Sequence, residues 1–124
     1  MNQRRTTELI VPINLRCEYL IDPLGVDTLR PRFSWTLESA VRGACQTGYQ
    51  IVVSSTSERL NRNNGDRWDS GKADSDRLAN VAYEGEELES GETCYWKVRV
   101  WNRDNNPGPW SDVAAFEMGL LKDD

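Results

Sequence analysis

Acidic side chains are the residues of this sequence whose types could most directly perform acid–base chemistry. Carboxyl groups catalyse hydrolysis as a pair whose surroundings push the two pKa values apart. Many of the acids occupy polar connecting stretches, among them Asp66, Asp69, Asp74, Asp76, Glu84, Glu86, Glu87 and Glu89. We expect these carboxylates to be solvated surface charges with unshifted pKa values. The pattern therefore predicts no catalytic pair.

Nucleophilic and metal chemistry find little support in the sequence. The chain has no histidine, so Ser–His and Cys–His nucleophile pairs cannot form and the usual zinc ligand sets reduce to three thiolates. Cys17, Cys45 and Cys94 lack metal-site spacing, and we expect them to be buried apolar side chains. One disulfide between two of them, or a reactive thiol, are the alternatives. The segment 61–65 lacks the acids of a calcium loop, and no phosphate-binding glycine loop is present. We expect no catalytic residue, metal or cofactor.

Aromatic and basic residues form the sharper candidate site. Four aromatic rings, those of Trp68, Tyr95, Trp101 and Trp110, are not obviously needed by the core, and flat exposed rings can stack on a sugar. The candidate residues are Trp68, Tyr95, Lys97, Arg99, Trp101 and Trp110. The first interpretation is structural, with Trp101 and Trp110 packing against the stems of Lys97 and Arg99. Sugar contact and burial against a neighbouring domain are the alternatives.

The strand that must position these residues lies at 94–102. Its side chains alternate, with Cys94, Trp96, Val98 and Val100 on one face and the aromatic and basic residues on the other. This two-residue period is typical of a half-buried strand. We therefore expect the apolar face of this strand to meet a second sheet.

Six further strands are expected along the chain, at residues 13–20, 32–38, 49–54, 67–72, 80–83 and 114–118. The inward row of the predicted core consists of Phe33, Trp35, Leu37, Tyr49, Ile51, Val53, Trp96, Val98 and Val100. Ser57 is the expected N-cap of a short helical turn through Leu60, which the segment 63–65 ends. Seven short strands with turns between them predict an all-β fold, a seven-stranded antiparallel β-sandwich of the immunoglobulin-like or fibronectin type III-like kind.

Length and charge narrow the possible functions. The chain has 124 residues, which suits one sandwich, and a net charge of −5. Because nucleic-acid binding needs a basic surface, we expect no nucleic-acid partner. No apolar run approaches the length of a membrane span, so we expect no membrane insertion. The first residues lack the apolar stretch of a signal peptide. The protein is thus expected in the cytoplasm, or in the periplasm or outside the cell if a signal peptide has been removed.

Family resemblance begins with Trp35, the alternating Tyr49, Ile51 and Val53, and the Leu88-x2-Gly91 element, which together resemble a fibronectin type III domain. A closer resemblance covers nearly the whole chain. Its blocks are 15–20, 22–27, 31–35, 42–51, 68–72, 95–101, 110–111 and 116–121. In order and spacing they resemble the amino-terminal immunoglobulin-like domain of bacterial α-L-rhamnosidases, glycoside hydrolase family 78.

The resemblance implies a domain plan and a role. Residues 1–11 are expected to be a flexible lead-in, 12–121 the sandwich, and 122–124 the start of a linker. In the resembled family further β-domains follow, and then a helical barrel carries the catalytic carboxylates, none of which has a counterpart here. The implied role is a non-catalytic module that packs against the downstream domains of the parent hydrolase. A module binding rhamnose-containing glycans and a cell-surface adhesion module are the alternatives.

One position departs from the resembled pattern. The family tends to place a tyrosine three residues after the glycine of Leu88-x2-Gly91, where its hydroxyl ties back to the corner. Cys94 occupies that position here. We therefore expect the tie to be absent or taken over by Tyr95, and the corner to be less rigid than usual.

Overall fold

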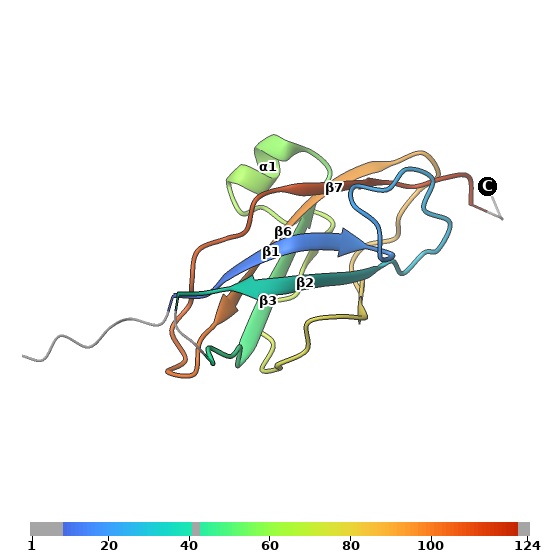
Figure 1. Cartoon of the computed structure of the whole chain (residues 1–124). Coiled ribbons are helices and arrows are strands. Elements are labelled where there is room, and N and C mark those ends of the chain that lie inside the picture. Colours follow the sequence, from blue (N-terminus) through green and yellow to red (C-terminus); the bar gives the residue numbers. More distant parts are fainter. Residues whose placement is uncertain (1–8, 41–42, 122–124) are drawn as a thin grey trace, which may run out of the picture.

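The computed structural model describes residues 9–40 and 43–121. It confirms the predicted sandwich of seven strands in two antiparallel sheets (Figure 1). One sheet has the order β1-β2-β5 and the other β4-β3-β6-β7. The strands are β1 (Val11–Cys17), β2 (Arg32–Glu38), β3 (Gly48–Ser54), β4 (Trp68–Asp69), β5 (Val81–Ala82), β6 (Thr93–Trp101) and β7 (Ala114–Glu117).

The core lies between the two sheets and contains the predicted inward row. Phe33 and Trp35 of β2, Ile51 and Val53 of β3, and Trp96, Val98 and Val100 of β6 are buried, while Leu37 and Tyr49 pack against them partly buried. The rings of Phe33 and Trp96 meet across the interface with centroids 4.4 Å apart. A single apolar interior thus joins the layers, and burial of these side chains is the main stabilising contribution.

The outer face of β6 is more enclosed than simple alternation predicts. Helix α1 (Ser57–Asn61) contacts β3 and β6, and its Leu60 is fully buried. Val52 is equally buried but lies outside the main core cluster. The helix therefore supports a second small apolar cluster on the outer face of the four-stranded sheet.

Two details of α1 correct the sequence-based expectations. The N-cap is Thr56, not Ser57, because the Thr56 hydroxyl accepts a hydrogen bond from the Arg59 amide at 3.1 Å. The left-handed residue after the helix is Asn63 (φ 59°), not Gly65. Gly65 is required for space, since a Cβ atom there would lie 2.4 Å from the Trp68 carbonyl oxygen.

Several strand boundaries also differ from the prediction. The first strand starts earlier, at Val11, and ends at Cys17 because Glu18 and Tyr19 adopt left-handed backbone conformations. Of the expected lead-in, residues 1–8 lie outside the described residues, but Ile10 is buried in the core. The expected edge strand 67–72 and the strand 80–83 shorten to two residues each. The expected linker, 122–124, lies outside the described residues.

Two of the three cysteines are buried, as the sequence predicts, and the third is not. Cys17 and Cys94 are buried, whereas Cys45 is exposed, and all three are free. Burial raises the pKa of both buried thiols to about 12, with neighbouring acidic residues adding to the effect. These two thiols are therefore held in the unreactive protonated form.

The corner before β6 is tied by residues other than those expected. Glu92 accepts a hydrogen bond from the Glu89 amide at 3.0 Å and pairs with Arg67. The Tyr83 hydroxyl donates to the carbonyl oxygens of Glu86 and Arg67. These contacts of Tyr83 and Glu92 hold the corner without a tyrosine three residues after Gly91.

Candidate functional site

The predicted aromatic and basic residues do meet on the outer face of the four-stranded sheet. Lys97 Nζ lies 4.7 Å from the centre of the Trp110 ring. Arg99 Cζ lies 4.8 Å from the same ring and 5.0 Å from the Trp101 ring. Lys72, which the sequence analysis did not single out, lies 5.3 Å from Trp101. We call Lys72, Trp101, Arg99, Trp110 and Lys97 the cation–aromatic stack. Its geometry confirms the packing interpretation of Trp101 and Trp110.

Backbone pairing brings Trp110 to this face. The Ser111 amide donates to the Val98 carbonyl at 2.8 Å, and the Val98 amide donates to the Ser111 hydroxyl at 3.1 Å. Residues 110–111 thus continue the edge of the sheet beside β6 before β7 begins. Because alternate residues of β6 point outward, Lys97 and Arg99 lie under the indole ring.

The cations of the stack are also fixed by hydrogen bonds. Lys97 Nζ donates to Asn63 Oδ1 at 2.6 Å, and Arg99 Nε donates to Gln50 Oε1 at 3.0 Å. Burial, with a smaller contribution from Arg99, lowers the pKa of Lys97. Trp101 itself is only 8% exposed. The stack is consequently a packed structural element rather than a flat open platform.

The other two candidate residues, Trp68 and Tyr95, are not members of the cation–aromatic stack. Trp68 belongs to the core side, where its ring stacks on Phe33 at 6.2 Å and meets Tyr83 edge-on at 5.5 Å. The expectation that the core does not need this ring is wrong. Tyr95 shares the outward face of β6 and is partly buried. Trp68 is therefore not part of the outward surface that carries the cation–aromatic stack.

Removal of Arg99 measures what the stack contributes. Arg99→Ala loses two cation–aromatic contacts and the hydrogen bond to Gln50, and we expect a loss of about 1–2 kcal/mol in the free energy of unfolding. Urea denaturation followed by circular dichroism measures it. Arg62→Ala, at an exposed arginine next to α1, is the matched control and should change stability by less than about 0.5 kcal/mol. Equal losses in the two variants would show that the stack contributes nothing.

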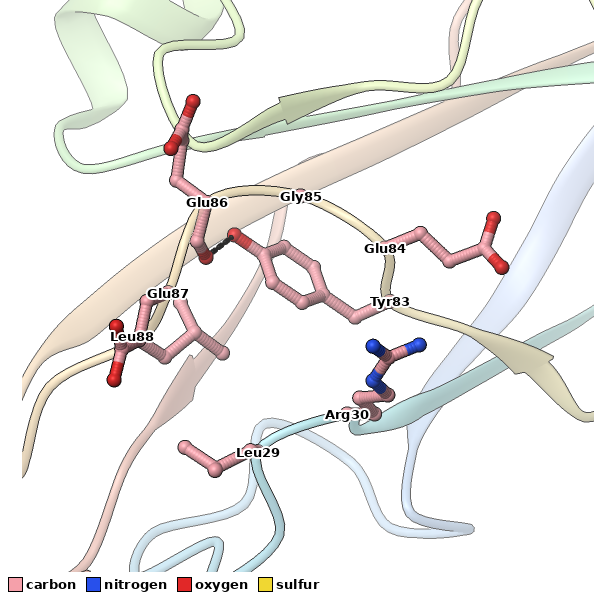
Figure 2. A pocket seen from close by; sticks show the side chains of 8 residues that line it. All are labelled: Leu29, Arg30, Tyr83, Glu84, Gly85, Glu86, Glu87 and Leu88. Carbon is pink, nitrogen blue, oxygen red and sulfur yellow. Dashed lines mark hydrogen bonds between the residues drawn. The ribbon is translucent and has the colours of Figure 1, made fainter.

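A hollow lies elsewhere, between the β1–β2 connection and the loop after β5 (Figure 2). Its volume is about 400 Å³, and it is lined by Leu29, Arg30 and residues 83–88. Figure 2 shows the carboxylates of Glu84, Glu86 and Glu87 pointing in different directions around the Tyr83 ring. Paired carboxyl chemistry needs two groups facing one substrate, and this hollow does not provide that arrangement.

One acid among those expected to be unshifted proves to be perturbed. Burial alone would raise the pKa of Asp66, but hydrogen bonds from the Ser55 hydroxyl and amide, together with nearby Arg59 and Arg67, hold it below its ordinary value. The residue ties the end of β3 to the loop before β4. Its shift reflects a structural role.

The Asp66 contacts predict a pH dependence. A carboxyl group whose pKa is lower in the folded state stabilises the fold above its unfolded pKa, and this contribution disappears as pH falls through the folded pKa. We expect Asp66→Asn to be less stable than the original chain at pH 7. The difference should shrink below about pH 4. Urea denaturation of both proteins at pH 7 and pH 3 checks this, and a gap that widens in acid would contradict it.

Within the described ranges, no group of three or more Cys, Asp or Glu side chains could hold a metal ion. In the same ranges, helix α1 is far too short to cross a membrane, and no other helix qualifies either.

Comparison with known proteins decides the family. The family model for Rha78A-like N-terminal immunoglobulin domains matches residues 12–122. The chain belongs to this family. The Rha78A-like domain is 44% identical to an α-L-rhamnosidase of Alteromonas sp. (strain LOR) over 106 residues, which is 85% of the chain but 11% of that relative. A rhamnosidase of Formosa agariphila is 37% identical over 81% of the chain and 10% of its own length.

Solved structures agree with this placement. The α-L-rhamnosidase from Dictyoglumus thermophilum matches the Rha78A-like domain with a TM-score of 0.87 and 43% identity, over 91% of this chain and 13% of that one. The α-L-rhamnosidase of Streptomyces avermitilis, complexed with L-rhamnose, matches with a TM-score of 0.85 and 38% identity, over 90% of this chain and 11% of that one. A human fibronectin type III domain, at 11% identity and a TM-score of 0.58, shares the fold alone. The Rha78A-like domain therefore spans about a tenth of the length of its similar relatives.

Proposed function

We propose that this domain is a non-catalytic accessory module at the amino-terminal end of an α-L-rhamnosidase-like glycoside hydrolase. It packs against the other domains and helps to hold or shield the catalytic one. The relatives named α-L-rhamnosidase are about ten times longer than the matched stretch, so the hydrolytic activity belongs to the parts of the parent that this chain lacks.

A rigid exit from the sandwich is the observation that carries the proposal. The Met118 amide donates to the Glu92 carbonyl at 2.8 Å, and the Leu121 amide donates to the Ser90 hydroxyl at 2.8 Å. Leu121 is partly buried and packs against the core. The chain is therefore held by the sandwich up to its last described residue, which suits a module of fixed orientation better than one on a flexible tether.

Carbohydrate binding receives no comparable support. Cations contact the rings of Trp101 and Trp110, which a sugar would have to reach. Titration of the chain with rhamnosides, followed by tryptophan fluorescence, is therefore expected to be flat. A saturable change that Trp110→Ala abolishes would instead favour the binding module.

Deletion tests the packing role. In the longer protein encoded by the gene, removal of residues 1–121 is expected to lower the midpoint of thermal unfolding, because the surface that the module covers becomes exposed. Addition of the separate chain should restore part of the loss. The isolated chain, which has its own complete core, should show no turnover of an aryl rhamnoside. A remainder of unchanged stability, or a gene that encodes no further domain, would overturn the proposal.

A further inference from the structure

Most of the exposed large apolar side chains among the described residues belong to the connection between β1 and β2 or to the exit of the chain, whereas Leu9 and Val113 lie elsewhere. Five exposed residues lie in or beside the connection between β1 and β2 and at the exit of the chain: Leu20, Ile21, Leu24, Leu29 and Leu120. Leu24 is 77% exposed and Leu120 is 88% exposed. We call these five residues the end face. Figure 1 shows the β1–β2 connection beside the last described residues of the chain.

Hydrogen bonds and close packing hold the end face in place. The Glu117 amide donates to the Pro23 carbonyl, and the amides of Val26 and Gly119 complete a short ladder between the two segments. Gly119 lies so close to Gly25 that a Cβ atom on it would be 3.2 Å from the Gly25 backbone. Pro23 and Val26 are buried under this ladder. Leu24 and Leu120 are therefore exposed by a fixed backbone, not by a loose loop.

Such exposure needs an explanation. An apolar patch on a rigid surface costs free energy in water, and patches of this kind rimmed by polar groups mark interaction sites. The rim here is acidic on one side, because Leu29 also lines the hollow to which Glu84, Glu86 and Glu87 contribute (Figure 2). Arg30 is the basic residue that lines the same hollow.

The position of the end face points to its occupant. The last described residue, Leu121, directly follows Leu120, and about nine-tenths of the length of similar relatives lies outside the matched stretch. We propose that the end face is the docking surface for the domain directly downstream in the same polypeptide, whose matching surface is apolar and carries Lys or Arg side chains opposite Glu84, Glu86 and Glu87. This inference rests on the proposed function.

Paired substitutions in the longer protein test the surface. Leu24→Asp with Leu120→Asp places two charges in the proposed interface, whereas Leu9→Asp places one on an exposed leucine before the other end of β1. In the isolated chain, all variants should keep the original unfolding midpoint, since these side chains are already in water. In the longer protein, the double variant should lower the midpoint by several degrees, and Leu9→Asp should not. Glu86→Lys with Glu87→Lys should produce a smaller loss that high salt reduces.

The outcomes separate this inference from the proposed function. If deletion of the module destabilises the longer protein but the double variant behaves like Leu9→Asp, the packing role stands and the end face is the wrong surface. If deletion has no effect, the proposed function itself fails. Concentration-dependent dimerisation of the isolated chain that the double variant abolishes would replace the downstream domain with a second copy as the occupant.

Discussion

Replacement of Trp96 by alanine is expected to lower the free energy of unfolding by about 3–5 kcal/mol. The Trp96 ring is fully buried at the centre of β6 and packs on Phe33 with centroids 4.4 Å apart. Removal of the ring leaves a cavity that the two paired sheets cannot close. Since small domains have about 5–15 kcal/mol of total stability, the variant should be close to unfolded at 37 °C.

Two variants control this prediction, which urea denaturation at 25 °C checks. Trp110→Ala removes the same residue type from a partly exposed site and should cost well under half as much. Trp96→Phe should cost less than about 1.5 kcal/mol, because the buried indole N–H has no hydrogen-bond partner among the described residues and its loss leaves no polar group unsatisfied. Equal losses for the two alanine variants would show that the core is not where the structure places it.

Glu92→Ala is expected to lower the free energy of unfolding by about 2–4 kcal/mol. Removal of one member of a fully buried ion pair typically lowers it by about 3–5 kcal/mol, and this pair is partly exposed. The side chain of Glu92 is 11% exposed and that of Arg67 is 28% exposed. The substitution leaves the Arg67 guanidinium without its counter-charge and the Glu89 amide without its acceptor. The corner before β6 should therefore loosen as the fold weakens.

Thermal unfolding of Glu92→Ala, followed by circular dichroism, gives the loss, and Glu86→Ala is the matched control. Glu86 is exposed, so its substitution should leave the midpoint within experimental error. Amide exchange in residues 88–92 should rise in Glu92→Ala alone. A midpoint unchanged by Glu92→Ala would contradict the view that this carboxylate replaces the usual corner tie.

Alternation predicted that the strands exist, because a period of two survives wherever one face is buried, but it did not predict all of their bounds. It could not predict which outward residues a loop or helix would cover. Trp101 is buried because Lys72 comes from a segment some thirty residues away in sequence, and Trp68 enters the core because its two-residue strand lies at the sheet edge. Such long-range contacts leave no trace in local periodicity.

The sequence of the β1–β2 connection carries a signal of the end face. Leu20, Ile21, Leu24 and Leu29 are apolar residues within a stretch whose Pro and Gly residues predict turns. Turn segments usually expose their side chains, and large apolar residues there fit the docking surface that we propose. Leu120 completes the set only in space, through the ladder between residues 23–26 and 117–119.

Hydrogen exchange provides the most direct test of the central claim that this domain works by docking through its end face. Amide exchange of residues 19–29 and 118–121 would be compared between the isolated chain and the longer protein. We predict slower exchange in the longer protein within these two segments, with little change around Lys97 and Trp110. Equal rates in both proteins, or protection centred on the cation–aromatic stack, would contradict the claim.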